Sequence, residues 1–131
     1  MQLIDSHTHI YGEEFDEDRD EMLARATSAG VGQMVLPNVD AESYPRVLDL
    51  CAAHPDRLFP TIGLHPTYVK EDYTSQLDYM ERELSQRPHV AIGEIGLDYF
   101  VPGLDPARQQ AVFEAQVRLA AEFGLPVILH T

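Results

Sequence analysis

A chain of 131 residues with 44% hydrophobic and 24% charged residues is long enough for one globular domain with its own hydrophobic core. The formal net charge of −13, from 9 Lys and Arg against 22 Asp and Glu, argues against a protein that binds nucleic acid through a broad basic surface. It leaves room for an enzyme whose bound metal ions meet phosphate directly.

The first half of the chain predicts two strands, each followed by a helix. The apolar segment QLIDS (residues 2–6) is the first expected strand, and GQMVLPNV (32–39) is the second. The first helix is expected to end at Gly30, while Asp40 is expected to cap the second helix, which stops before Pro55. Helical spacing of apolar residues predicts the buried faces, with Met22, Leu23, Ala26 and Ala29 in the first helix and Tyr44, Val47, Leu48 and Cys51 in the second.

The second half predicts three strands and two helices. The expected strands are LFPTIGLHP (58–66), HVAIGEIGLD (89–98) and PVILH (126–130). One helix is expected after Thr74, and another is expected from a cap at Asp105 to a stop at Gly124. Their predicted apolar residues are Leu77, Met80 and Leu84 in the former and Phe113, Val117, Ala120 and Phe123 in the latter.

Strand and helix therefore alternate with a repeat of roughly 30 residues, the size of a βα unit. The strands are nearly continuous apolar runs, which is typical of parallel strands covered on both faces. Two α/β architectures fit this pattern, an open doubly wound sheet or part of a (β/α)8 barrel. No Gly-x-Gly-x-x-Gly motif follows the first strand, which disfavours a dinucleotide-binding sheet.

Several other classes are disfavoured. The single Cys51 excludes an internal disulfide and a metal site of paired cysteines, and we expect a buried thiol. No apolar run reaches the ~18 residues of a membrane-spanning helix. The start lacks a basic region followed by an apolar stretch, so we expect no signal peptide and a cytoplasmic protein. The acid-rich run at 13–21 predicts a solvated helix start.

Two histidines, His7 and His9, stand two residues apart at the end of the first predicted strand. Residues at this spacing point to the same side of a strand, so both imidazoles would crowd one small volume. Two neutral core histidines with separate hydrogen-bond partners would satisfy the pattern. A metal ion held by both is the sharper interpretation, because imidazole is a common metal ligand.

Other polar residues also fall where predicted strands end. His65 ends the third strand, Glu94 the fourth and His130 the fifth, and parallel α/β folds place their chemistry at this edge. Imidazole and carboxylate suit Zn, Mn or Fe, while carboxylate and water suit Mg. Glu94 has two oxygens with which to bridge two ions about 3.5–4 Å apart. The neighbouring Gly93 and Gly96 would let backbone or ligands approach closely.

The remaining polar residues receive less specific predictions. His65 is expected to contact substrate or transfer a proton rather than ligate a metal. Asp5 shares the inward parity of the histidine pair, so it either lies beneath the pair as a hydrogen-bond acceptor or is a buried structural carboxylate. Asp98 either orients a ligand or shapes its loop. His54 and His89 lie away from the strand ends and are expected to be ordinary surface or loop residues.

Four segments, IDSHTH, TIGLHP, AIGEIGLDY and PVILHT, resemble in this order and spacing the TatD-like metal-dependent DNases of the amidohydrolase superfamily. The resemblance covers the chain from its first predicted strand to its last residue. It implies that His7 and His9 hold one metal ion, that Glu94 bridges two ions and that His130 ligates the second. It also implies that His65 lies near the scissile phosphate.

The resemblance further implies a (β/α)8 barrel of the TIM type. Residues 1–131 are expected to supply its first five strands and four helices. A complete barrel takes ~250 residues, and the family pattern needs one more histidine and one aspartate ligand from later strands. We therefore expect the chain to be the amino-terminal part of a longer enzyme.

The activity implied by the resemblance is hydrolysis of phosphodiester bonds in DNA, often from the 3′ end, with two divalent ions of Mg, Mn or Zn. Two alternatives stay open, an amidohydrolase relative that acts on another ester such as a lactone or phosphotriester, and a non-catalytic metal-binding fragment. DNA is the expected substrate, and no stable protein partner and no membrane contact are predicted. The first and fifth strands would be open edges, through which the chain is expected to self-associate.

Overall fold

The computed structural model describes residues 1–131, and strands and helices alternate along the chain in the predicted order. Two short 3-10 helices, Glu13–Phe15 and Pro66–Tyr68, lie in loops that follow the first and third strands. The five strands are β1 (Leu3–Asp5), β2 (Val31–Leu36), β3 (Leu58–Pro60), β4 (Ile92–Gly96) and β5 (Val127–His130). The four helices are α1 (Arg19–Ser28), α2 (Tyr44–Ala53), α3 (Tyr73–Gln86) and α4 (Pro106–Phe123).

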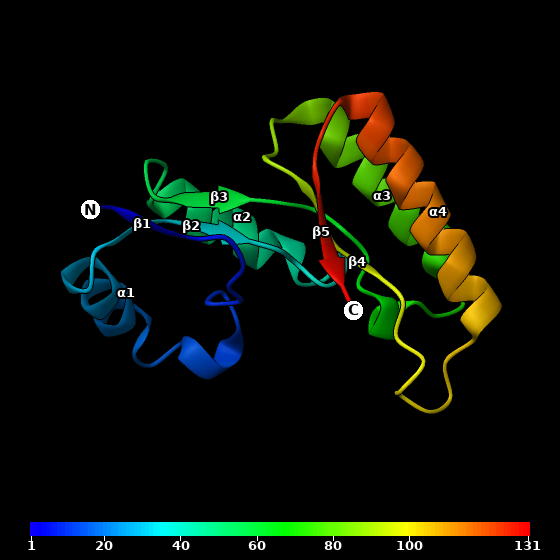
Figure 1. Ribbon diagram of the computed structural model, residues 1–131, viewed down its shortest axis with the longest axis horizontal. Helices are drawn as coiled ribbons and strands as arrows, with labels where there is room; N and C mark the ends of the chain where they lie inside the picture. Colours follow the sequence, from blue (N-terminus) through cyan, green and yellow to red (C-terminus); the bar gives the residue numbers. More distant parts are fainter.

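All paired strands are parallel, and they follow one another in sequence order. One group contains β1, β2 and β3, and a second contains β4 and β5. An isolated parallel bridge between Ile62 and Ile92 joins the groups. Figure 1 shows α1 and α2 with the first group and α3 and α4 side by side with the second. This is an α/β fold of the (β/α)8 type, with five strands and four helices present.

Apolar side chains pack into two clusters, one beside each group of strands. Burial of such side chains, at about 25 cal/mol per Å² of apolar surface, is the main force holding helices on the sheet. The first cluster contains Ile10, Tyr11, Leu23, Met34, Leu36, Val47, Cys51 and Leu58. The second contains Tyr44, Ile62, Leu64, Val69, Met80, Leu84, Ile92, Ile95, Val112 and Ala120.

The ends of α4 confirm the predicted cap and stop. The carboxylate of Asp105 accepts hydrogen bonds from the backbone N–H groups of Ala107 and Arg108, and Pro106 opens the helix. Gly124 ends it in the left-handed conformation, with φ of 64°. The cap and the stop could be predicted from the sequence because each depends on one residue and its near neighbours in the chain.

The predicted buried face of α4 is wrong in part, because Val117 is exposed. The buried residues of this helix are Gln109, Val112, Gln116 and Ala120. Two glutamines lie on this face because it meets backbone N–H and C=O groups of neighbouring loops rather than apolar atoms alone. The spacing of the apolar residues alone therefore predicted a buried face of α4 that is rotated from the observed one.

The start of α2 also differs from the prediction. Asp40 does not cap the helix, which begins three residues after the expected position with Ser43 at its N-cap. The Asp40 carboxylate instead accepts the backbone N–H of Ser43 and closes a turn before the helix. The predicted buried stripe of α2 is confirmed, because Tyr44, Val47 and Cys51 are buried. Helix α3 begins at Tyr73, although it was expected only after Thr74.

The expectation that every strand is covered on both faces is correct for β4 and wrong for β1 and β5. Every residue of β4 is buried, whereas β1 and β5 lie at the two ends of the strand order. A terminal strand has a neighbouring strand on one side only, so its side chains are less buried. The exposed apolar residues there are Leu3, Ile4, Val127 and Leu129. None of the helices is long and apolar enough to cross a membrane.

His89 was predicted to be an ordinary surface or loop residue, and it lies in a loop but is buried. Its Nε2 atom is hydrogen-bonded to the hydroxyl of Tyr44, and its Nδ1 faces the backbone oxygen of Arg87. Burial lowers the pKa of His89, so the ring is kept neutral. His54 lies at the C-cap of α2, as an ordinary loop residue.

Candidate metal centre

The candidate residues come from four strands, and all but Glu94 lie at or beyond a carboxyl end. His7 and His9 follow β1, His65 follows β3, and His130 is the last residue of β5. Glu94 differs slightly from its expected place, because it lies in the middle of β4 and not at the end. It is 6% exposed, so this carboxylate is withdrawn from solvent at the point where the other side chains converge.

Two donor atoms of the histidine pair face one oxygen of Glu94. The Nε2 atom of His7 lies 3.0 Å from Oε2 of Glu94, and that of His9 lies 3.3 Å from it. The two Nε2 atoms are 3.1 Å apart. Ligand atoms at ~2.0–2.2 Å from a tetrahedral ion are about 3.3–3.6 Å from one another. The three donor atoms therefore have close to the spacing that a single divalent ion requires.

A second set of donors surrounds the other oxygen of Glu94. Oε1 lies 3.0 Å from Nδ1 of His130 and 3.7 Å from Nε2 of His65. The Nε2 atom of His130 is 2.8 Å from Oδ2 of Asp98. Since a carboxylate fixes the ring from the far side, Nδ1 of His130 is directed at Glu94. Both sets of donors are spaced closely enough to hold an ion, and they share Glu94.

Asp98 contacts both His130 and the backbone of its own loop. One carboxylate oxygen holds His130, while the other accepts the backbone N–H groups of Phe100 and Val101. The hydrogen bond from His130 holds the pKa of Asp98 below its usual range. Asp98 thus remains an anion that can orient the imidazole, and it shapes the loop between β4 and α4.

Two groups of Thr67 contact Nδ1 of His65. The hydroxyl oxygen lies 2.8 Å away, and the backbone N–H, which can only donate, lies 3.2 Å away. These contacts favour a neutral ring with its proton on Nε2, which faces Nδ1 of His130 at 3.2 Å and the carboxylate of Glu94. An Nε2–H group is a hydrogen-bond donor and not a metal ligand, which suits contact with substrate or proton transfer.

Burial and neighbouring charges act in opposite directions on the pKa values of Glu94 and the histidines around it. Burial opposes its ionisation, but the hydrogen bond from His130 and the nearby His65, His7 and His9 rings outweigh burial and lower the pKa of Glu94. Burial works against a charge on His130 too, yet Asp98 and Glu94 raise its pKa. For His65 burial dominates and lowers the pKa, despite the attraction of Glu94. The carboxylate is therefore ionised and available as a ligand.

Asp5 does not lie where either prediction put it. Its side chain is exposed, so it is not a buried structural carboxylate, and it makes no hydrogen bond to an imidazole. Oδ1 of Asp5 accepts the backbone N–H of His7 at 3.1 Å. The alternation of side chains along β1 did not determine the position of the Asp5 side chain, because the strand ends at Asp5 and the chain turns there. Asp5 acts on the backbone that carries His7.

Glycines allow β5 to approach Glu94. A Cβ atom on Gly93 would lie 2.6 Å from Cβ of Ile128 and 2.9 Å from its backbone oxygen, both on β5. A Cβ atom on Gly96 would collide with the backbone oxygen of His130. Only glycine fits at such close approaches. The prediction that Gly93 and Gly96 allow close approach is confirmed, and the atoms that approach them belong to β5.

Sequence reasoning missed Tyr11, whose hydroxyl oxygen lies 2.9 Å from Nδ1 of His9. It is buried, and it lines a cavity of about 340 Å³ together with His9, His65, Tyr68 and Glu94. The signal that could have found it is the spacing of two residues from His9, the same spacing that separates the two histidines.

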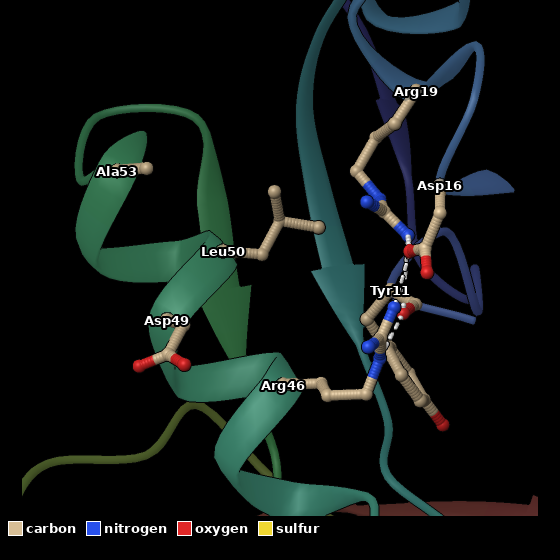
Figure 2. A pocket seen from close by; sticks show the side chains of 7 residues that line it. All are labelled: Tyr11, Asp16, Arg19, Arg46, Asp49, Leu50 and Ala53. Atoms are coloured by element: carbon tan, nitrogen blue, oxygen red, sulfur yellow. Dashed lines mark hydrogen bonds and ion pairs between the residues drawn. The ribbon is translucent and has the colours of Figure 1, made fainter. Parts of the chain in front are cut away.

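Two arginines hold the chain segment that carries Tyr11 (Figure 2). Arg19 donates from Nε to the backbone oxygen of Ile10 at 2.7 Å, and Arg46 donates from Nε to that of Tyr11 at 2.9 Å. Both guanidinium groups also bind Oδ1 of Asp16. Hydrogen bonds from Arg19 and Arg46 lower the pKa of Asp16, so this carboxylate stays charged between them.

A parallel β/α sheet that gathers four histidines and a carboxylate at one place has the architecture of the metal-dependent hydrolases built on the (β/α)8 barrel. Residues 4–131 match the family of TatD related DNases, and the chain belongs to this family. The resemblance found in the four sequence motifs is thereby confirmed.

Individual relatives agree with this assignment. The chain is 40% identical to the uncharacterized metal-dependent hydrolase YjjV of Escherichia coli K12, over 99% of this chain and 51% of that protein. It is 37% identical to the 3'-5' ssDNA/RNA exonuclease TatD of Erwinia tasmaniensis, over 98% and 49%. The crystal structure of the Escherichia coli TatD homologue YjjV superposes with a TM-score of 0.90 at 38% identity, covering 98% of this chain and 50% of that one. The chain thus spans about half the length of the relatives it matches.

Proposed function

We propose that residues 1–131 supply the amino-terminal half of a single TatD-type barrel that hydrolyses phosphodiester bonds in DNA, acting as an exonuclease from the 3′ end. The observation that carries the proposal is the sharing of Glu94 between two sets of donor atoms, one on each carboxylate oxygen. A bridging carboxylate of this kind is the central ligand of two-metal hydrolases.

The donor sets assign the ligands. His7, His9 and Glu94 would hold one divalent ion, and Glu94 with His130 would hold a second, of Mg, Mn or Zn. When bound, such ions make a nucleophile available at neutral pH and stabilise negative charge on the reacting phosphate. The imidazole and carboxylate chemistry of the site fits these metals. Further ligands, one histidine and one aspartate, are expected from later strands of the family barrel.

The other side chains have roles around these ligands. His65 presents its Nε2–H group to the same space as Glu94, where it would donate to a phosphate oxygen or pass a proton to the leaving oxygen. Asp98 keeps the ring of His130 turned toward Glu94, and Tyr11 does the same for His9. The carboxylate of Glu94 supplies the negative charge on which both ions depend.

The choice of DNA follows from the family and not from the surface of the chain. The relative from Erwinia tasmaniensis is named a 3'-5' ssDNA/RNA exonuclease, and the family is that of the TatD related DNases. With a net charge of −13, binding of a polyanion depends on the metal centre. Another ester substrate, such as a lactone or phosphotriester, is not favoured. A cytoplasmic location and self-association through the open edges of β1 and β5 belong to the same proposal.

The test compares residues 1–131 with the encoded polypeptide, should its reading frame extend further. Each is incubated with Mn²⁺ or Mg²⁺ and single-stranded DNA labelled at either end, beside a panel of lactones and phosphotriesters. We expect mononucleotide release from the 3′ end in the longer polypeptide and almost none from residues 1–131. Elution volume at two concentrations reports self-association. Turnover of the ester panel without DNA cleavage would refute the proposal.

A further inference from the structure

Helix α4 turns two fully buried glutamines toward the candidate site. Gln109 and Gln116 are each 1% exposed. They are seven residues apart, about two helical turns, and so lie on the same face of one 18-residue helix. Buried amides need partners for both the oxygen and the nitrogen, because an unpaired polar group in the interior is costly.

Gln116 binds both backbone groups of one residue. Its Oε1 accepts the N–H of Leu64 at 2.7 Å, and its Nε2 donates to the backbone oxygen of Leu64 at 3.2 Å. Leu64 directly precedes His65. Helix α4 therefore fixes the peptide groups from which His65 extends, and with them the place where its side chain begins.

Gln109 repeats this contact on another loop. Its Oε1 accepts the N–H of Asp98 at 2.8 Å, and its Nε2 donates to the backbone oxygen of Asp98 at 2.9 Å. The carboxylate of Asp98 in turn holds Nε2 of His130. Two loops that follow different strands are thus tied to one helix by the same pair of hydrogen bonds.

We propose that Gln109 and Gln116 are positioning residues of the centre, Gln109 for His130 through Asp98 and Gln116 for His65 through Leu64. The assignment of His65 and His130 to catalysis rests on the proposed function, whereas the placement of their rings does not. Each glutamine offers an acceptor and a donor at the distance of one residue's N–H and C=O, which no apolar side chain can replace.

The test uses the metal-free chain first, so that it is independent of activity. Long-range ¹H–¹⁵N spectra of the histidine rings report which nitrogen carries the proton. In Gln116→Met the Nε2–H form of His65 is expected to give way to a mixture of forms. In Gln109→Met the hydrogen-bonded Nε2–H signal of His130 is expected to be lost. The exposed Gln110 lies on the same helix, so Gln110→Met is the matched control and should change neither signal.

Metal binding gives the second measurement. Loss of a group that holds a ligand in place typically weakens metal binding 10–100-fold. Mn²⁺ titration followed by electron paramagnetic resonance should show weaker binding of the ion at His130 in Gln109→Met by about this factor. The ion at His7 and His9 should keep its affinity, and Gln116→Met should bind both ions as the unchanged chain does.

The outcomes separate the two proposals. Unchanged ring signals of His65 and His130 in both folded variants would overturn the positioning roles. Ring signals of His7 and His9 that change as much as those of His65 and His130 would also overturn them, because such a result indicates that the whole fold has become less rigid. If a methionine variant does not fold, Gln116→Glu or Gln109→Glu retains the acceptor oxygen and should show the same signal change to a smaller extent. A chain that shows these effects but cleaves no DNA refutes the proposed function alone.

Discussion

Replacement of Gly93 by alanine tests whether the close approach of β5 to β4 builds the site. The added Cβ would lie 2.6 Å from Cβ of Ile128, whereas carbon atoms in contact are ~3.5–4.0 Å apart. The overlap is thus about 1 Å. The obstacles are a Cβ and a backbone oxygen of a paired strand, so neither can rotate away.

Inserting one methyl group into a tightly packed place costs about 1–3 kcal/mol, and Gly93→Ala is expected at the upper end. For a chain of this size, 1 kcal/mol corresponds to roughly 3–5 °C in Tm, so Tm should fall by roughly 9–15 °C. Any relief of the clash separates β4 from β5, and with them Glu94 from His130. Mn²⁺ binding by these two residues should therefore weaken as well.

Urea denaturation and Mn²⁺ titration measure the two effects. Gly32→Ala is the matched control, because the atoms nearest to its added methyl group on β2 belong to the exposed side chain of Gln2, which can move aside. We expect the control to change stability by less than about 0.5 kcal/mol. If Gly93→Ala unfolds at the same urea concentration as Gly32→Ala and binds Mn²⁺ as tightly as the unchanged chain, the reasoning about strand approach is wrong.

Four further substitutions have defined outcomes. In the longer polypeptide that the proposed function requires, Glu94→Ala should abolish hydrolysis and loosen both ions, while His65→Ala should lower turnover and leave metal content nearly normal. Loss of metal with His65→Ala, measured by elemental analysis, would make His65 a ligand. Because burial lowers the pKa of His89, the unfolded chain gains a proton that the folded chain resists, so stability is lost as pH falls below ~6.5. His89→Gln should flatten this loss in urea denaturation at pH 7.5 and 5.5. Arg46→Ala should cost about 1 kcal/mol, since its bonds to Tyr11 and Asp16 are partly exposed, and Arg82→Ala on α3 serves as its control.

The sequence was most informative where function and fold depend on short-range patterns. Alternation of strands and helices gave the α/β class, and the strand-end rule brought His7, His9, His65, Glu94 and His130 to one place. The family motifs then selected the barrel over the open sheet. None of these inferences required knowledge of which loops meet in space.

Prediction failed where a polar side chain serves a distant backbone group. Gln109 and Gln116 interrupt an apolar pattern, and their partners are 11 and 52 residues away in the chain. Asp40 resembles a helix cap until the turn that it closes is known. His89 lies in a loop, and its burial cannot be seen until Tyr44 is placed beside it. In each case a long-range or turn-specific hydrogen bond overrides the local signal.

The division of the core into two clusters would give a bound metal ion a mechanical role. The histidine pair belongs to the part of the chain built on β1, β2 and β3, whereas Glu94 and His130 belong to β4 and β5. One isolated bridge joins these strand groups, although α2 packs into both clusters. An ion held by His7, His9 and Glu94 would therefore be a cross-link across the seam of the sheet. At a concentration 100 times its Kd it would oppose opening of that seam by about 2.7 kcal/mol, so amide exchange at Ile62 and Gly93 should slow when metal is added.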